Sequence, residues 1–195
     1  MPVESVEELR EAIAQGAVPK YLLFWGHSPR RDATIGSSCL SQWWPASFVV
    51  DGVDFATAEH YMMWRKALLF GDADIATRVL EVAHPSEAKN LGRRVRNFDE
   101  QVWDRARFDI VVAGSVAEFG QDEALGGYLA GTAGRVLVEA SPMDRVWGIG
   151  LTADDPRAAD PARWRGLNLL GFALMRARGE LIAAHDRGVA GTPSS

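Results

Sequence analysis

The chain has 195 residues and a formal net charge of −5, from 21 Lys and Arg against 26 Asp and Glu. This balance argues against binding of long DNA or RNA through the overall field of the protein, although it allows a site that recognises one nucleotide. The single cysteine, Cys39, cannot form an internal disulfide or a cysteine-based zinc site. The sequence contains no apolar stretch of about 18 residues, which a membrane span needs, and no secretory signal. We therefore expect a cytoplasmic, single-domain protein.

Capping and turn signals divide the chain into helices and a few short strands. Ser5 followed by Glu8 forms a capping box, which predicts the start of a helix. Asp51-Gly52 lies between two short apolar runs and predicts a tight hairpin turn. Helices are expected over 6–15, from Thr57 to about 70, from about 73, from 85, from Asp99, over 123–129 and from about 168. Strands are expected over 21–25, 48–50, 53–55 and 136–138, with long loops over 26–41 and 150–166.

The predicted helices outnumber the predicted strands, and alternating strand–helix–strand units are absent. This pattern argues against a doubly wound parallel sheet. It predicts the α+β class: a single, mostly helical domain with a small β-sheet of three or four strands. We expect this domain to cover residues 1–187 and a flexible tail to cover 188–195.

The helix that begins after Thr57 carries an acid and a base on one face. Glu59 and Lys66 are seven residues apart, so they lie within roughly 20° of each other around the axis and about 10 Å apart along it. The aromatic residues and methionines around them predict a buried helix, in which each charge needs a partner. Both residues are candidates for catalysis. The alternative is a glutamate in the first turn, favoured by the helix dipole, and a solvated lysine.

Residues 138–150 form a polar turn between a predicted strand and a Trp-Gly-x-Gly sequence. Asp144 and Trp147 place a carboxylate next to an aromatic face, and Gly148 allows a backbone to approach a ligand closely. This combination indicates a binding loop. In the alternative interpretation Asp144 caps a helix and Trp147 fills the core.

Two basic segments are candidates for phosphate binding. Arg163 and Arg165 precede the last predicted helix, whose first N–H groups, near Asn168, could hold an anion. Lys89 and Arg93 belong to a basic run on a short predicted helix. In both segments the alternative is a solvated basic surface. The histidines show no metal-binding spacing, and neither a P-loop, a dinucleotide-binding fingerprint nor a nucleophile elbow occurs.

Several of these motifs occur in one order along residues 21–183. They are Trp43-Trp44-Pro45-Ala46-Ser47-Phe48, then Thr57-Ala58-Glu59-His60-Tyr61 continuing to Lys66, then Glu87-Ala88-Lys89-x-Leu91-Gly92-Arg93, Leu137-Val138-Glu139-Ala140-Ser141-Pro142-x-Asp144-x-x-Trp147-Gly148-Ile149-Gly150, and Gly166-x-Asn168-x-Leu170-Gly171. In this order they resemble the NADAR family, the YbiA-like N-glycosidases. The resemblance covers most of the chain and implies a YbiA-like fold.

The resemblance also implies hydrolysis of an N-glycosidic bond between a phosphoribose and a base-like amine, without a metal or redox cofactor. The implied substrates are phosphoribosylamino-pyrimidine intermediates of riboflavin biosynthesis. Alternatives are an ADP-ribosyl-guanine hydrolase that acts on nucleic acid and a non-catalytic ADP-ribose or nucleotide-binding module. The net charge of −5 favours the small metabolite, whereas a basic cluster around the site would favour nucleic acid. Glu59 and Lys66 together argue against the binding module, because a binder of anions needs no carboxylate.

Roles for particular residues follow from the resemblance. Glu59 and Asp144 are the two candidates for the carboxylate that orients water and stabilises an oxocarbenium-like state. Lys66 holds Glu59 ionised, protonates the leaving base, or attacks the opened sugar as an amine. Trp44 and Trp147 are expected to stack on the heterocycle. The substrate-binding set is Gly26, Arg30, Trp44, His60, Lys89, Arg93, Trp147, Gly148 and Asn168, in which Arg30, Lys89, Arg93 and the amides near Asn168 are expected to hold phosphate.

Overall fold

The computed structural model describes residues 3–28 and 34–190, with side chains described up to 187. Its elements, in chain order, are α1 (Val6–Ala14), β1 (Lys20–Phe24), β2 (Phe48–Val50), β3 (Val53–Phe55), α2 (Ala58–Leu69), α3 (Ala73–Glu81), α4 (Pro85–Gly92), α5 (Glu100–Gln121), α6 (Glu123–Gly131), β4 (Arg135–Glu139) and α7 (Leu169–Ala190). Short 3-10 helices cover Ser37–Leu40, Pro156–Ala159 and Pro161–Arg163. The expected α+β class, mostly helical with little strand, is confirmed.

Most helices begin at the side chains that the sequence indicates. The Ser5 hydroxyl accepts from the N–H of Glu8, the Thr57 hydroxyl accepts from the N–H of His60, and the Asp99 side chain caps α5. Capping satisfies backbone donors that the first turn of a helix leaves free. The helix α7 extends to Ala190, and no helix in the described part of the chain is long and apolar enough to cross a membrane.

The four strands form two separate two-stranded sheets, whereas the sequence predicted one small sheet. β1 pairs in parallel with β4, so that Phe24 lies opposite Glu139 at the carboxyl end of both strands. β2 pairs with β3 as a hairpin. The side chain of Gln121 on α5 bonds to both backbone groups of Val49, at 2.9 and 2.7 Å. This side chain occupies the outer edge of β2, which a third strand would need.

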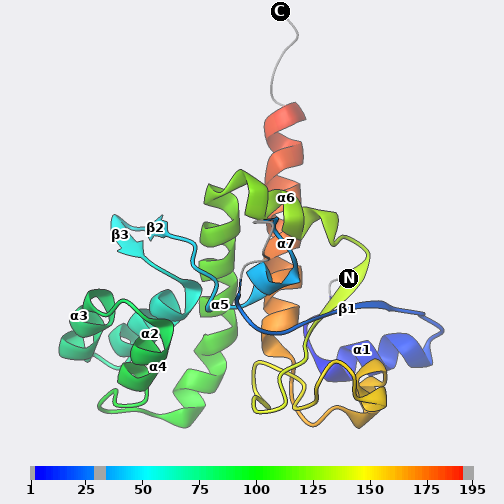
Figure 1. Cartoon of the computed structure of the whole chain (residues 1–195), viewed down its shortest axis with the longest axis horizontal. Helices are drawn as coiled ribbons and strands as arrows, with labels where there is room; N and C mark the ends of the chain where they lie inside the picture. The colour runs from blue at the N-terminus through cyan, green and yellow to red at the C-terminus, as the bar shows by residue number, and fades with distance from the viewer. Residues whose placement is uncertain (1–2, 29–33, 191–195) are drawn as a thin grey trace, which may run out of the picture.

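The long helices α5 and α7 pack side by side at the centre of the molecule (Figure 1). The helices α2, α3 and α4 lie on one side of this pair, and β1, β4 and α1 lie on the other. The hydrophobic core follows the same division, with one cluster around α2 and α5 and a second between α1, β4 and α7. The end of β4 and the loop after it therefore meet α2 and α4 across the base of α5.

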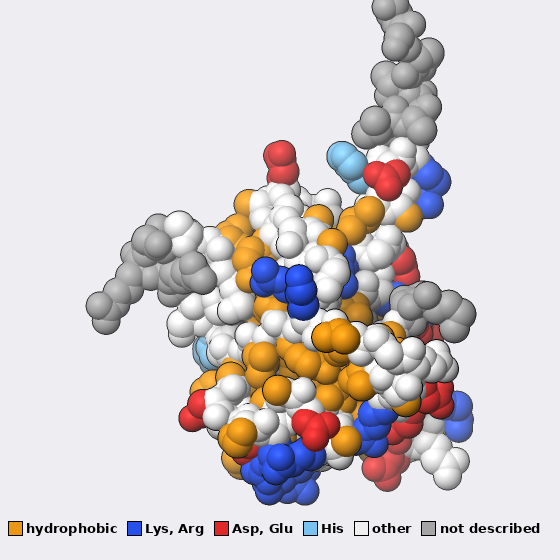
Figure 2. All heavy atoms as spheres, turned by 90° about the vertical axis from the view of Figure 1, so that its right-hand side faces the viewer, with side chains coloured by type: hydrophobic (Ala, Val, Ile, Leu, Met, Phe, Trp, Pro, Cys, Tyr) orange, Lys and Arg blue, Asp and Glu red, His pale blue; other side chains and the backbone are white. Residues whose placement is uncertain are grey.

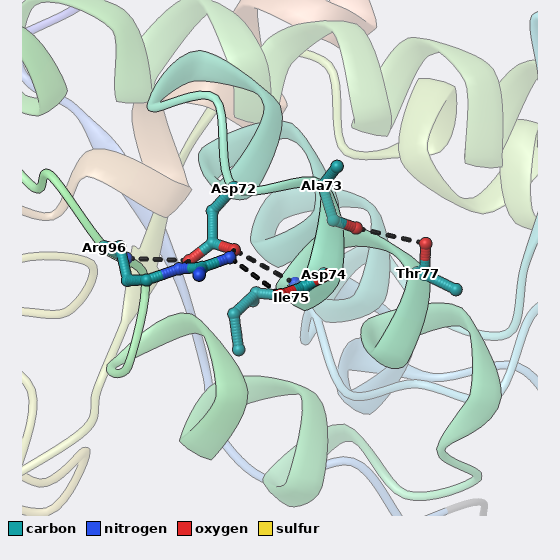
Figure 3. Close-up of polar contacts among 6 residues, drawn as sticks. All are labelled: Asp72, Ala73, Asp74, Ile75, Thr77 and Arg96. Carbon is teal, nitrogen blue, oxygen red and sulfur yellow. Dashed lines mark hydrogen bonds and ion pairs between the residues drawn. The ribbon is translucent and has the colours of Figure 1, made fainter.

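A buried carboxylate, Asp72, fastens α3 to the chain that leaves α4. It accepts hydrogen bonds from the backbone N–H of Arg96 at 2.8 Å, from Nε at 3.1 Å and from Nη2 at 2.6 Å (Figure 3). It also caps α3 through the N–H of Ile75. These donors hold the pKa of Asp72 well below its usual range, and the guanidinium of Arg96 has the largest effect. Asp74, which is exposed, pairs with the same guanidinium at 2.9 Å.

Removal of the Asp72 charge should therefore weaken the α3–α4 unit. We expect Asp72→Asn to lower the melting temperature by several degrees at pH 7, because the variant leaves Arg96 facing a neutral amide. The matched control is Asp74→Asn, which removes an exposed carboxylate from the same arginine and should have little effect, as exposed ion pairs usually do. Thermal denaturation followed by circular dichroism measures both. Equal effects of the two substitutions would contradict this role.

Candidate active site

A pocket of about 380 Å³ opens between α2, α4, α5 and the loop that follows β4. It brings together six of the residues predicted from the sequence, which are Glu59, Lys66, Lys89, Arg93, Asp144 and Trp147. A larger hollow of about 620 Å³ lies on the outer side of α2 and α5, but none of its titratable side chains is buried. The smaller pocket is therefore the candidate active site.

Glu59 is nearly completely buried in this pocket, with 2% of its surface exposed. Its Oε2 accepts a hydrogen bond from the indole N–H of Trp43 at 3.1 Å, while Oε1 has no hydrogen-bond partner among the described residues. The pKa of Glu59 is raised to about 7, chiefly by burial. Asp144 contributes to the rise, whereas Lys89 and the Trp43 N–H lower the pKa. A carboxyl group with a pKa near neutrality is suited to accept and return a proton.

Glu139, to which the sequence analysis assigned no role, supplies a second buried carboxyl group. Its Oε2 is buried without a hydrogen-bond partner in the described part of the chain. Burial raises its pKa to about 8, Asp144 and Glu59 add to the rise, and Lys89 opposes it. Its backbone N–H donates to Oδ1 of Asn168 at 2.9 Å, which fixes the end of β4. The one sequence signal was its place at the end of a buried strand, directly before a polar turn.

Asp144 shapes the loop as well as lining the pocket. Its Oδ1 accepts from the N–H groups of Val146 and Trp147 at 2.8 and 2.7 Å. The sequence left open a helix cap at Asp144, but no helix directly follows it, and these bonds instead hold the loop. Gly148 lies where a Cβ would meet the carbonyl oxygens of Glu139 and Asp144, at 2.9 and 3.2 Å. Close packing of the loop therefore requires a glycine at this position.

Lys66 lies two helical turns from Glu59 on α2. Its Nζ is 4.3 Å from the ring centroid of Phe98 and 5.4 Å from that of Trp103. Burial lowers the pKa of Lys66, although Glu59 raises it. No carboxylate of the described residues lies within ion-pair distance of Nζ. Lys66 is therefore a partly desolvated cation held by aromatic rings and not by a counter-charge.

The two adjacent tryptophans have opposite surroundings. Trp44 is 8% exposed and belongs to the hydrophobic core, so it does not line the pocket where the sequence analysis expected it to stack. Trp43 instead contacts the site. Besides its bond to Glu59, its ring lies 5.9 Å from that of His84 and 5.8 Å from Nζ of Lys89. Neighbouring side chains in non-helical backbone point in different directions, and the sequence alone does not say which one faces inward.

Three other predicted binding residues lie outside the pocket lining or outside the described chain. His60 is buried, and its ring bonds to the Thr57 hydroxyl at 2.8 Å and to the carbonyl of Val82 at 3.2 Å. It therefore ties α2 to the end of α3. Gly26 makes the turn that leaves β1, with a φ of 79°. Arg30 lies outside the described residues.

Asn168 is fully buried and joins α7 to β4. Its Nδ2 donates to the carbonyl of Leu137 at 2.9 Å, and its Oδ1 accepts from Glu139. The backbone N–H groups of residues 168–170 donate to the carbonyls of residues 148, 146 and 147. The expected phosphate site at the start of α7 is corrected by this arrangement, because its first amides already have partners. Among the described residues, no group of three or more His, Cys, Asp or Glu is placed to hold a metal ion.

Comparison with known proteins identifies the family to which the chain belongs. The model of the NADAR domain matches residues 23–182. The chain belongs to the NADAR domain family. It is 42% identical over 166 residues to an N-glycosidase of Acanthamoeba polyphaga mimivirus, covering 83% of this chain and 96% of that protein. An N-glycosidase of Nostoc punctiforme is 31% identical over 143 residues, covering 73% and 85% of the two chains.

Two further similarities concern a longer relative and the fold. The chloroplastic riboflavin biosynthesis protein PYRR of Zea mays is 32% identical over 139 residues, which cover 68% of this chain and 20% of that protein. The NMR structure of the E. coli protein YbiA aligns with a TM-score of 0.68 at 24% identity, covering 88% of this NADAR chain and 90% of YbiA. The resemblance noted from the sequence motifs is confirmed, as is the YbiA-like fold.

The raised pKa of Glu139 has a consequence for stability. The folded state keeps its proton above the usual value of 4.5 and up to about pH 8, so folding becomes less favourable as the pH rises between these values. We expect Glu139→Gln to melt several degrees above the wild type at pH 8.5, with the difference shrinking toward pH 5. Melting curves from pH 5 to 9 measure this, with the exposed Glu81→Gln as control. A destabilisation that is equal at every pH would contradict the assignment.

Proposed function

We propose that this NADAR protein is an N-glycosidase that cleaves the bond between C1′ of a phosphoribose and the nitrogen of a base-like amine. Its proposed substrates are the phosphoribosylamino-pyrimidine intermediates of riboflavin biosynthesis. The observation that carries the proposal is Glu59, a buried carboxyl with a pKa near 7 whose Oε1 has no partner among residues 3–28 and 34–187, in a pocket that also contains Asp144 and Trp147. The mimivirus and Nostoc relatives are N-glycosidases, which supports the reaction, and the maize relative is a riboflavin biosynthesis protein, which supports the substrate class.

In the proposed reaction, water adds to C1′ as the C1′–N bond breaks. Glu59 accepts a proton from the water, and a proton passes to the leaving nitrogen from Glu59, or from Lys66, which then recovers it from Glu59, so the products are a free sugar phosphate and an amine. The carboxylate of Asp144 stabilises the positive charge that develops at C1′ in the oxocarbenium-like transition state. Trp147 offers an aromatic face to the heterocycle. Each of these groups lines the same pocket.

Lys66 keeps three candidate roles in this reaction. It holds Glu59 ionised, protonates the leaving base, or attacks C1′ of the opened sugar as an amine. The lowered pKa of Lys66 and its place over two aromatic rings suit an amine that exchanges its proton.

A second candidate function is removal of ADP-ribose from a guanine base in nucleic acid. The observation in its favour is the basic lining of the pocket, where five Lys and Arg side chains face two carboxylates in a protein of net charge −5. On the face seen in Figure 2, however, Lys and Arg form separate groups, one near the lower edge and others higher up and to the right, with apolar side chains between them and no continuous track. A local cluster is enough for one phosphate group, whereas a polyanion needs several contacts along its length. A non-catalytic binding module is disfavoured, because buried carboxyl groups weaken the binding of an anion.

The test is hydrolysis by the purified protein of a phosphoribosylamino-pyrimidine and of an ADP-ribosylated guanine oligonucleotide, side by side. We expect release of ribose 5-phosphate from the first, and a loss of about 100-fold or more in kcat for Glu59→Gln. Glu118→Gln is the matched control, because Glu118 is also a buried glutamate but lies outside the pocket on α5. ADP-ribose released only from the oligonucleotide would favour the second function. Neither product from folded protein would contradict both.

A further inference from the structure

We infer that Arg107 forms the phosphate subsite of this pocket, at the end opposite Glu59, and that it binds the 5′-phosphate of a ribosyl substrate. The inference rests on the proposed function and extends it, because it places one chemical group of the substrate. The sequence analysis assigned no role to Arg107.

The side chain of Arg107 lines the pocket and has one unused donor, which a turn of the side chain would have to bring to a ligand. It extends from α5, is 15% exposed, and lines the pocket. Its Nη1 pairs with Asp104 at 2.7 Å, whereas its Nε is buried and has no hydrogen-bond partner among the described residues. A buried donor without an acceptor is costly, so a ligand that supplies one is favoured. The Nε edge of a guanidinium can bind two oxygens of one phosphate group.

The neighbours of Arg107 make this end of the pocket cationic. Trp103 lies one turn earlier on the same face of α5. Nζ of Lys66 is 5.4 Å from the centroid of the Trp103 ring, so both cations flank this aromatic residue. The carboxylate of Asp104 is half exposed and turned to Nη1, and it leaves the Nε edge free.

The spacing of charges along α2 sets the orientation of the substrate. Glu59 and Lys66 are separated by about 10 Å along the helix axis. The carbon that gains positive charge belongs beside Glu59 and Asp144, and a phosphate placed there would be repelled by both carboxylates. A ribose that spans the pocket therefore directs its phosphate away from the two carboxylates and toward Arg107.

The other candidate donors differ from Arg107. The first amides of α7 donate to carbonyls of the preceding loop. Lys89 lies near the two buried glutamates, whose pKa values it lowers. Arg93 and Arg145 also line the pocket but are exposed, so Arg107 is the cation of the lining that has a buried donor without a partner in the described part of the chain.

Direct binding to the full-length protein tests this assignment without requiring turnover. Isothermal titration at pH 7 would compare ribose 5-phosphate, ADP-ribose and unphosphorylated ribose. We expect Arg107→Gln to weaken binding of both phosphorylated ligands about tenfold or more and to leave ribose unchanged. Arg107→Lys should recover part of the loss, because it restores the charge but not the paired donors. Arg105→Gln, on the exposed face of the same helix, is the matched control and should bind as the wild type.

The result separates this inference from the proposed function. Equal affinity of Arg107→Gln and wild type for ribose 5-phosphate would overturn the subsite, and so would an equal loss for ribose. If the wild type hydrolyses N-glycosides while Arg107→Gln keeps the same KM for the phosphorylated substrate, the function stands and the subsite fails. If Arg107→Gln selectively loses phosphate binding in a protein that cleaves neither test substrate, the subsite stands and the proposed function fails.

Discussion

The burial of two carboxyl groups, Glu59 in the wall of the pocket and Glu139 at the end of β4 outside its lining, is the constraint on which the site depends. A carboxylate removed from water without a counter-charge is costly, and a protein can meet this cost by raising the pKa or by supplying donors. Both occur here. The indole of Trp43 donates to Glu59, Lys89 lies near both acids, and the remaining cost appears as pKa values of about 7 and 8. The proposed proton transfer depends on the raised pKa of Glu59, which burial causes.

Rigid neighbours keep these groups in place. Asn168 bonds to the backbone on both sides of Val138 and so holds the end of β4, while the loop from Asp144 to Gly148 packs too closely for a Cβ at its last position. Near α4, Asp72 fastens the chain that leaves this helix to α3 through Arg96. The pocket thus combines carboxylates from α2 and from the loop after β4 with Lys and Arg side chains from the surrounding helices, a mixture of charges that suits a phosphoribosyl substrate.

Local signals in the sequence predicted more of the fold than of the site. Thr57 and Asp99 cap their helices as expected, because capping depends on a few adjacent residues. Helical spacing also placed Glu59 and Lys66 in one pocket. The sequence did not predict the choice between Trp43 and Trp44 or the unpaired Nε of Arg107, because both depend on how distant segments pack. The division into two sheets was missed for the same reason, since the side chain that occupies the edge of β2 lies on α5.

The most direct test of this account is a titration of the glutamate side chains, followed by the ¹³C shift of their carboxyl carbons and assigned with Glu59→Gln. The account predicts that Glu59 titrates near pH 7 in the wild type, and that Trp43→Phe, which keeps the ring but removes the N–H donor, raises this value. Trp44→Phe, in the core, should leave it unchanged. A Glu59 that titrates near its usual value of 4.5 in folded protein, with no response to Trp43→Phe, would contradict the account.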